Sequence, residues 1–243
     1  MFRRSSSRNT KSSRRRRNNT PVDTATALIQ ATGIEKSFGT LKVLKGIDFS
    51  ASDREVVSIV GASGAGKSTL LSILGSLSRP DAGRVLINGT DIFSLGEKPL
   101  AAFRNREIGF VFQFHHLLPE FTAMENVLLP AMIGGKCDAA VKERARTLFE
   151  DLGVAARMTH KPSEMSGGEQ QRVAVARALI NSPAVLLADE PSGNLDSVTR
   201  AELHKMFFTL RDKYGITIVI VTHDKDLAAM SDRTLEMRDG LFV

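Results

Sequence analysis

Residues 61–69 read Gly61-Ala62-Ser63-Gly64-Ala65-Gly66-Lys67-Ser68-Thr69 and fit the pattern G-x-x-x-x-G-K-[ST]. Glycines in such a loop let backbone N–H groups approach phosphate oxygens without a Cβ in the way. Lys67 would bring a positive charge to the β- and γ-phosphates of a nucleotide, and the Ser68 hydroxyl is a ligand for Mg²⁺. The stretch therefore predicts a phosphate-binding loop, or P-loop, whose following helix points its positive end at the anion.

The segments around this loop predict an α/β fold. Residues 55–60 have the composition of a buried strand, and residues 67–77 have helical spacing, with four leucines on one face. From Ala27 onward strand-like and helix-like segments alternate, which is typical of a largely parallel sheet. Further strands are expected at residues 84–87, 108–112, 185–188 and 216–221, and a hairpin turn at 238–240.

The middle of the chain, residues 99–165, is mostly helical in pattern. Asp138 is the expected N-cap of a helix that runs to Leu152 and stops at Gly153. We therefore expect one folded domain over residues 26–243, with a helical subdomain at about 99–165.

The composition fits a globular chain without a membrane-spanning segment of its own. Of the 243 residues 42% are hydrophobic, enough for one domain with a sizeable core. No apolar run approaches the roughly 18–20 residues that a membrane-spanning helix needs, and we expect no secretory signal because no apolar segment follows the basic N-terminus. Cys137 is the one cysteine, which suits a reducing compartment.

Residues 1–25 are predicted to be a disordered basic tail. Eight basic residues and no acid lie within residues 1–22, and without them the net charge of +6 becomes slightly negative. The rest of the chain therefore gives no reason to expect a nucleic acid partner. The tail has almost no apolar side chains with which to fold, although contact with anionic lipid, or a start codon assigned too far upstream, fits the same composition.

Residues 185–190 read Val-Leu-Leu-Ala-Asp-Glu, an apolar strand that ends in two acids. Carboxylates at the end of a strand beside a P-loop strand are placed to hold Mg²⁺ and to act on water. Asp189 is the expected metal-side acid, and Glu190 the group that orients or deprotonates the attacking water. Alone the two acids would fit a strand that merely ends in solvent, but with residues 61–69 they predict a P-loop NTPase.

A second glycine-rich motif narrows the class. Ser166, Gly167 and Gly168 begin a segment with helical spacing, and a serine with two glycines at a helix start forms an anion cradle. Beside a complete P-loop, a second cradle must serve a different nucleotide. The stretch resembles the signature of ABC ATPases, with Met165 for the usual leucine and Glu169 before the glutamine. The resemblance implies a homodimer in which each ATP lies between one subunit's P-loop and its partner's signature.

Four more positions match the ABC ATPase pattern and take their roles from that resemblance. Gln113 matches the Q-loop glutamine that touches Mg²⁺ and faces the membrane partner. His223 matches the switch histidine that contacts the γ-phosphate, and Asp196 lies in the loop that links the two sites across the dimer. Phe38 stands where an aromatic ring stacks on adenine, although a place in the core fits this residue type as well.

The resemblance covers residues 27–243 and is closest to the ATP-binding subunits of bacterial lipoprotein-releasing systems, which are related to macrolide-exporter and cell-division ABC ATPases. It rests on residues 112–122 and 235–240. Within the first stretch, His115 and His116 are interpreted as a contact with a membrane subunit, with a plain surface loop as the alternative. Adjacent histidines do not converge on one ion, which argues against a metal site.

The resemblance implies an ABC-type ATPase that uses ATP and Mg²⁺ at the cytoplasmic face of the bacterial inner membrane. Its partners would be a second copy of the chain and separate membrane-spanning subunits, and its task the release of lipoproteins toward the outer membrane. A related exporter and a regulatory cell-division complex remain alternatives, which the membrane proteins that co-purify would separate. ABC ATPases that act on nucleic acid carry long coiled coils or tandem domains, for which 243 residues leave no room.

Overall fold

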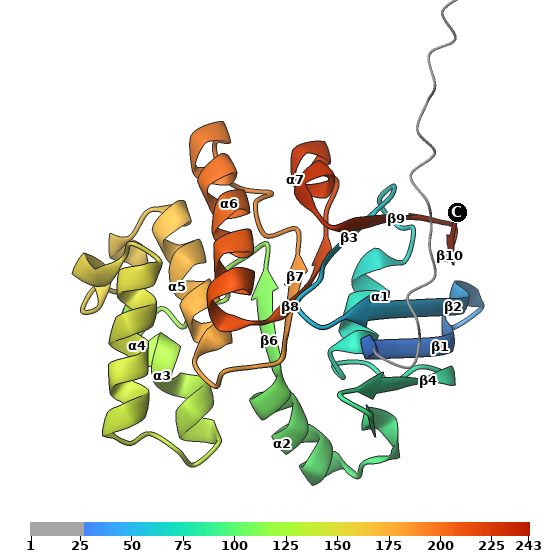
Figure 1. Ribbon diagram of the computed structural model, residues 1–243, viewed down its shortest axis with the longest axis horizontal. Helices are drawn as coiled ribbons and strands as arrows, with labels where there is room; N and C mark the ends of the chain where they lie inside the picture. The colour runs from blue at the N-terminus through green and yellow to red at the C-terminus, as the bar shows by residue number, and fades with distance from the viewer. Residues whose placement is uncertain (1–26) are drawn as a thin grey trace, which may run out of the picture.

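The computed structural model describes residues 27–243, within which the strands form two sheets (Figure 1). The tail predicted for residues 1–25 lies outside these described residues. The four-stranded sheet contains β1 (Ala27–Phe38), β2 (Leu41–Ser52), β4 (Ala82–Ile87) and β5 (Thr90–Asp91), in the order β2-β1-β4-β5. The six-stranded sheet contains β3 (Val56–Val60), β6 (Ile108–Phe112), β7 (Val185–Asp189), β8 (Thr217–Val221), β9 (Arg233–Arg238) and β10 (Leu241–Phe242), in the order β10-β9-β3-β8-β7-β6.

The six-stranded sheet confirms the predicted parallel arrangement. Its strands run parallel from β9 through β3, β8 and β7 to β6. Strands β3, β7 and β8 are buried almost throughout, which is why they read as continuous apolar segments. The predicted hairpin is also present, because β10 pairs antiparallel with β9 across Asp239 and Gly240, whose φ angles are 49° and 79°. The four-stranded sheet is antiparallel and was not predicted.

Helices cover both faces of the sheet and form a separate group at one side (left in Figure 1). There α3 and α4 pack against α5. Asp138 caps α4 by accepting a hydrogen bond from the Val141 amide at 3.0 Å, and the chain leaves at Gly153 with a φ of 67°, as predicted. Among residues 27–243 no helix has the length and apolar character to cross a bilayer. The helices are α1 (Lys67–Leu74), α2 (Glu97–Glu107), α3 (Ala123–Ile133), α4 (Ala139–Asp151), α5 (Gly167–Leu179), α6 (Ser197–Tyr214) and α7 (Lys225–Met230), with short 3₁₀ turns η1 (Ile92–Ser94), η2 (Ala155–Arg157) and η3 (Pro162–Glu164).

Helix α1 ends earlier than the leucine spacing predicts. It stops at Leu74, and Ser76 takes a φ of 58°, which turns the chain out of the helix. The Ser76 amide donates to the Ile73 carbonyl and the Leu77 amide to the Ser72 carbonyl, the pair of bonds that closes a helix C-terminus. Leu77 is consequently 50% exposed, and the prediction that the helix extends to it was wrong.

The core lies on both faces of the parallel sheet. Alternate side chains of one strand point to opposite faces, so Leu186 and Ile218 pack with Phe149 and Phe207, whereas the next residue of each strand packs with Leu70 of α1. The first cluster lies under the helical group and α6. The second joins the parallel sheet to α1 and to the antiparallel sheet. The P-loop strand is thereby held between two apolar layers.

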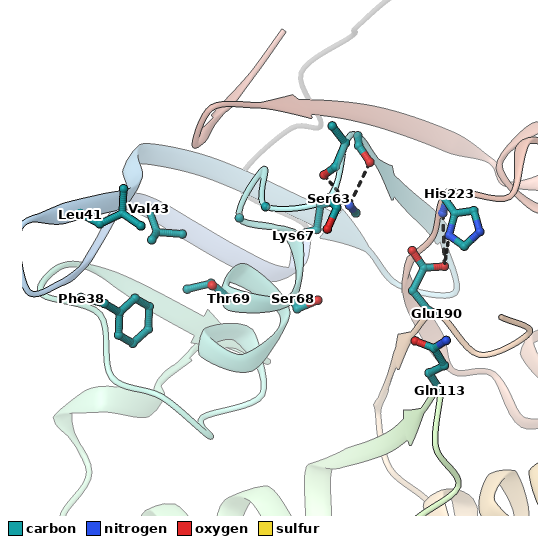
Figure 2. Close-up of a pocket in the computed structure, with 14 residues that line it drawn as sticks. Phe38, Leu41, Val43, Ser63, Lys67, Ser68, Thr69, Gln113, Glu190 and His223 are labelled. Carbon is teal, nitrogen blue, oxygen red and sulfur yellow. Dashed lines mark hydrogen bonds and ion pairs between the residues drawn. The ribbon is translucent and has the colours of Figure 1, made fainter. Parts of the chain in front are cut away.

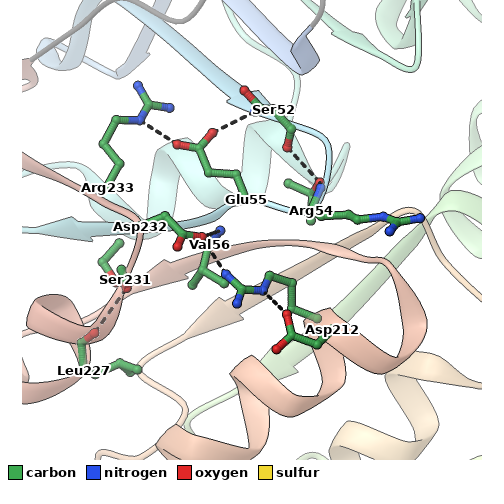
Figure 3. Close-up of polar contacts among 12 residues, drawn as sticks. Ser52, Arg54, Glu55, Val56, Asp212, Leu227, Ser231, Asp232 and Arg233 are labelled. Atoms are coloured by element: carbon green, nitrogen blue, oxygen red, sulfur yellow. Dashed lines mark hydrogen bonds and ion pairs between the residues drawn. The ribbon is translucent and has the colours of Figure 1, made fainter.

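Polar contacts fix the starts of β3 and β9 (Figure 3). Asp232 accepts hydrogen bonds from the Val56 amide and from Arg211, both at 2.8 Å. Glu55 accepts from the Ser52 amide at 2.7 Å and from Arg233 at 2.9 Å. These bonds hold the register of β3 at its amino end, so the opposite end of the strand delivers the P-loop to a defined place.

Candidate functional site

A cavity of about 680 Å³ opens beside the P-loop (Figure 2). Ligand sites in proteins span roughly 300–1,000 Å³, so the cavity can hold a nucleotide. It gathers residues from β1, β2, the start of α1, and the loops after β6, β7 and β8. The lining residues are Phe38, Leu41, Val43, Gly61, Ala62, Ser63, Gly64, Gly66, Lys67, Ser68, Thr69, Gln113, Glu190 and His223.

At two positions of the P-loop, only glycine fits the backbone conformation and the space available. Gly66 has a φ of 104°, and a Cβ there would lie 2.9 Å from a Leu44 methyl group. A Cβ on Gly61 would lie 2.1 Å from the Met237 carbonyl oxygen. Helix α1 starts at Gly66 without a side-chain cap, so its first N–H groups remain available to an anion.

Lys67 is 8% exposed, and its ammonium donates to the carbonyls of Gly61 at 2.9 Å and Ala62 at 3.0 Å. A nearly buried ammonium needs such partners because leaving it unpaired would be costly. Ala65 is the one residue of the predicted loop that does not line the cavity; it is buried, and its carbonyl accepts from the Gly240 amide at 3.1 Å.

Ser68 lines the cavity, and its partner Asp189 is not itself among the lining residues. The Ser68 hydroxyl donates to the Asp189 carboxylate at 3.0 Å. Burial raises the pKa of Asp189, and the neighbouring Glu190 raises it further, while the Ser68 bond and Lys67 act in the opposite direction. A partly buried carboxylate next to a hydroxyl offers hard oxygen ligands, so this pair fits Mg²⁺.

Glu190 follows β7 in a left-handed conformation, with a φ of 46°, which is unusual for a residue with a side chain. Its amide donates to the Val221 carbonyl at 2.9 Å, which holds this conformation against β8. One oxygen of its carboxylate lies 2.9 Å from His223 Nδ1 and 3.3 Å from the His223 amide nitrogen. Glu190 and His223, two of the three predicted catalytic residues, thus meet at the same rim (Figure 2).

Gln113 follows β6 and lies beside Glu190 (Figure 2). Its side-chain amide donates to Asn194 at 3.2 Å, and the Asn194 side chain donates back to the Gln113 carbonyl at 3.4 Å. A Cβ on Gly193 would lie 2.9 Å from the Gln113 amide nitrogen. The sequence placed Gln113 at the site, but it gave no signal for its pairing with Asn194, because the two residues are far apart in the chain.

Phe38 ends β1 at the outer wall of the cavity and is 57% exposed. The alternative that it belongs to the core was therefore wrong. Leu41 and Val43 of β2 line the same wall, which the sequence analysis missed. The signal available was their alternation after the Gly39 turn, which points both side chains to one face.

The signature residues do not line this cavity. Ser166 caps α5, whose first two residues are Gly167 and Gly168. A Cβ on Gly168 would lie 2.5 Å from a methyl group of Thr199, so the motif packs against the start of α6. Asp196 caps α6 by accepting from the Val198 and Thr199 amides at 3.0 and 3.1 Å. The structure therefore brings these four predicted nucleotide-binding residues into one neighbourhood that is separate from the P-loop cavity.

The loop after Gln113 is firmly held. Arg177 of α5 donates to the carbonyls of His116 at 2.6 Å and His115 at 2.8 Å. The fully buried Asn126 binds both the amide and the carbonyl of Leu118, at 2.7 and 3.1 Å. The His116 ring packs edge-on against Phe112, with centroids 5.3 Å apart. The predicted partner-facing loop is thus fixed from two helices.

Comparisons with known proteins agree with this geometry. The sequence profile described as "ABC transporter" matches residues 44–193. The chain is 60% identical to the lipoprotein-releasing system ATP-binding protein LolD of Bacteroides thetaiotaomicron, with 88% of this chain and 98% of that protein covered. It is 58% identical to the LolD of Porphyromonas gingivalis, with the same 88% and 98% covered.

Solved structures give the same result. The dimeric structure of MJ0796, a bacterial ABC transporter cassette, matches with a TM-score of 0.81 and 37% identity over 88% of this chain and 96% of that one. A dimeric post-hydrolysis state of the MJ0796 ATP-binding cassette, bound to ADP and Pi, matches with a TM-score of 0.80 and 36% identity over 88% of this chain and 96% of that one.

Proposed function

This chain belongs to the ABC transporter family, and we propose that it is the ATP-binding and ATP-hydrolysing subunit of a lipoprotein-releasing transporter. The observation that carries the proposal is one cavity lined by the P-loop and by the paired Glu190 and His223, with Ser68 of that P-loop hydrogen-bonded to Asp189. The cargo is inferred from relatives that are 58–60% identical over nearly their whole length.

ATP fits the cavity with its phosphates on the P-loop and its base at the outer wall. The Lys67 ammonium would exchange the Gly61 and Ala62 carbonyls for β- and γ-phosphate oxygens, a stronger charge-assisted interaction. The exposed Phe38 ring would stack on adenine, with Leu41 and Val43 beside it.

Mg²⁺ would be held by Ser68, Asp189 and Gln113. When bound, it neutralises charge on the β- and γ-phosphate oxygens. Asp189 favours cation binding at this site, because burial disfavours its charged form and a neighbouring cation would stabilise that charge.

Hydrolysis requires in-line attack of water on the γ-phosphorus, which forms an oxygen–phosphorus bond and breaks the bond to ADP. Glu190 accepts a hydrogen bond from that water and takes its proton. His223 fixes the Glu190 carboxylate through its ring and its amide, and it is itself exposed on the cavity side, where it can reach the γ-phosphate. Most of the rate enhancement in this class of reaction comes from such positioning and electrostatics.

The other half of each site comes from a second copy of the chain. Ser166, Gly167 and Gly168 are an anion cradle that does not face the P-loop cavity of its own subunit. In a two-fold dimer each cradle can face the partner's cavity, and Asp196 lies between the two sites. The dimeric MJ0796 cassettes support this arrangement.

The membrane-spanning subunits would bind through the helical region, residues 99–165, at the cytoplasmic face of the bacterial inner membrane. The loop after Gln113 exposes Phe114, Leu118 and Phe121 on a backbone held by Arg177 and Asn126. Fixed, exposed apolar groups are suited to a protein interface. Because Gln113 itself lines the ATP cavity, closure around ATP would be felt directly at this loop.

Phosphate release by the purified protein tests the chemistry. The wild type should hydrolyse ATP, and Glu190→Gln should reduce turnover about 10²-fold or more while leaving ATP binding intact, because the amide keeps shape and hydrogen bonding but cannot take the proton. Turnover retained in Glu190→Gln would overturn the assignment of the base. For the cargo, the membrane proteins that co-purify from detergent extracts should include dedicated transporter subunits and an acylated lipoprotein.

A further inference from the structure

The signature includes a negative charge, although its Ser166–Gly168 cradle is proposed to bind a negatively charged phosphate. Residues 166–168 are small, and the first N–H groups of α5, at Gly167 and Gly168, suit an anion. The next residue, Glu169, places a carboxylate in the first turn of the same helix, α5. A carboxylate there stabilises the helix itself, but it repels any anion that approaches the cradle.

Both oxygens of this carboxylate are engaged. One oxygen accepts from the Arg157 guanidinium at 2.7 Å, and the other accepts from the Ser166 amide at 2.8 Å. Within residues 27–243, Arg157 is the only cation that forms an ion pair with Glu169. The pair is partly shielded from water, with 37% of the Arg157 side chain and 28% of the Glu169 side chain exposed. The Arg157 bond is also the largest of the effects that lower the pKa of Glu169 to about 2.

We propose that Arg157 is a positioning residue of the signature, which makes the Ser166–Gly168 cradle able to accept the γ-phosphate of ATP bound by a second copy of this chain. It does so by neutralising Glu169 and by turning its carboxylate onto the Ser166 backbone, away from the face that meets the nucleotide. This inference rests on the proposed shared site.

The hydrogen bonds explain why orientation matters as well as charge. Ser166 Oγ accepts from the Glu169 amide at 3.3 Å, so its own hydrogen stays free to donate to a phosphate oxygen. The reciprocal bond from the Ser166 amide to Glu169 fixes the backbone that carries this hydroxyl. Without Arg157, the charge of the Glu169 carboxylate is unpaired, and only the bond from the Ser166 amide remains to hold its orientation.

The same contact ties the cradle to the rest of the helical group. Arg157 lies at the end of η2, and its guanidinium also contacts the His160 ring at 3.3 Å. The His160 carbonyl accepts from the Ala123 amide at the start of α3, at 2.8 Å. A displacement of α3 would therefore reach the cradle through Arg157.

The test measures ATP-dependent dimerisation in a Glu190→Gln parent, by sedimentation at saturating ATP. Arg157→Met should weaken the dimer on the order of tenfold, because a like charge left unpaired at an interface is strongly unfavourable. Adding Glu169→Gln should restore parental dimerisation, since it removes the charge that Arg157 neutralises. Arg146→Met, which breaks the exposed Arg146–Glu143 pair of α4, is the matched control and should have no effect.

The outcomes separate the possibilities. The proposal would be overturned if Glu190→Gln/Arg157→Met/Glu169→Gln dimerised as weakly as Glu190→Gln/Arg157→Met, because Arg157 would then act through the fold and not through Glu169. It would also be overturned if Glu190→Gln/Arg157→Met dimerised as tightly as the Glu190→Gln parent. ATP binding by the isolated monomer should be unchanged in every variant. If the Glu190→Gln parent itself stays monomeric with ATP, the shared site fails, and that result is distinct from a failure to rescue.

Discussion

The Lys67 side chain is bound to the P-loop backbone and is expected to bind the phosphates of ATP. Its ammonium is nearly buried and is satisfied by two P-loop carbonyls. We expect Lys67→Ala to weaken ATP binding about 10- to 100-fold, since a charge-assisted hydrogen bond contributes roughly 1.5–3 kcal/mol. Titration with a fluorescent ATP analogue measures this, with the exposed Lys142→Ala as control. Equal affinity in Lys67→Ala and the wild type would contradict the P-loop assignment.

The partly buried Asp189 is expected to lower the stability of the nucleotide-free protein, although Mg²⁺-dependent hydrolysis needs it. Burial raises the pKa of Asp189 above its value in the unfolded chain, so folding favours the protonated form. At neutral pH the charged form therefore lowers the free energy of unfolding when Mg²⁺ is not bound. Asp189→Asn should therefore raise the Tm of the nucleotide-free protein, by roughly 2–4 °C for each kcal/mol, while abolishing Mg²⁺-dependent hydrolysis. The gain should be largest at neutral pH and above and should shrink as the pH falls through the raised pKa. A lower Tm at pH 7 would contradict this view of the site.

The sequence motifs predicted which residues line the site, but not the residues to which they are hydrogen-bonded. Lys67, Ser68, Glu190 and His223 all line one cavity, as the motifs imply. Asn194 was missed as the partner of Gln113, because a hydrogen bond between residues far apart in the chain leaves no local pattern. The left-handed φ of Glu190 was missed for a similar reason, since only the tertiary contact with β8 holds it.

At the scale of elements, the loop from Gln113 to Phe121 connects the ATP cavity with the proposed membrane contact. His115 and His116 were the residues expected to contact a partner. The next residue, Leu117, packs against the core, so its loss would cost stability, of order 2–5 kcal/mol.

The exposed aromatic residues are the better test of this loop. We expect Phe114→Ser with Phe121→Ser to reduce co-purification with membrane subunits sharply, because exposed apolar groups contribute strongly to such interfaces. The Tm should stay within about 4 °C of the wild type. Met230→Ser, a comparably exposed apolar residue on α7, is the control. Undiminished recovery of membrane subunits would rule out docking at this loop.

The parallel strands could be predicted, whereas the antiparallel sheet could not. Strands β3, β7 and β8 are buried on both faces and give uninterrupted apolar runs. The β1–β2 pair has several register shifts, which break the regular alternation that marks a half-buried strand. The end of α1 was missed because Ser76, and not a glycine, takes the left-handed position.

In the molecule as a whole, one chain carries the two parts of the proposed shared nucleotide site at separate places. The P-loop, Glu190 and His223 lie at the end of the parallel sheet, whereas Ser166–Gly168 lie at the start of α5, against α6. The sequence implied this division through the argument that a second cradle beside a complete P-loop serves a different nucleotide, and through the family resemblance. It could not give the distance between the two motifs, because no local pattern tells how far apart two motifs fold. The structure adds a physical reason for the proposed assembly: the Ser166–Gly168 cradle does not line the P-loop cavity of its own subunit, so its use on a nucleotide would require a second subunit.

The shared site is tested most directly by the mass of Glu190→Gln in solution, measured by light scattering with and without ATP. Because this variant is expected to bind ATP without hydrolysing it, we expect a monomer without nucleotide and a stable dimer with ATP. Adding Lys67→Ala to the same variant should abolish the dimer, since the P-loop half is lost. A Glu190→Gln protein that demonstrably binds ATP and remains a monomer would contradict the shared site.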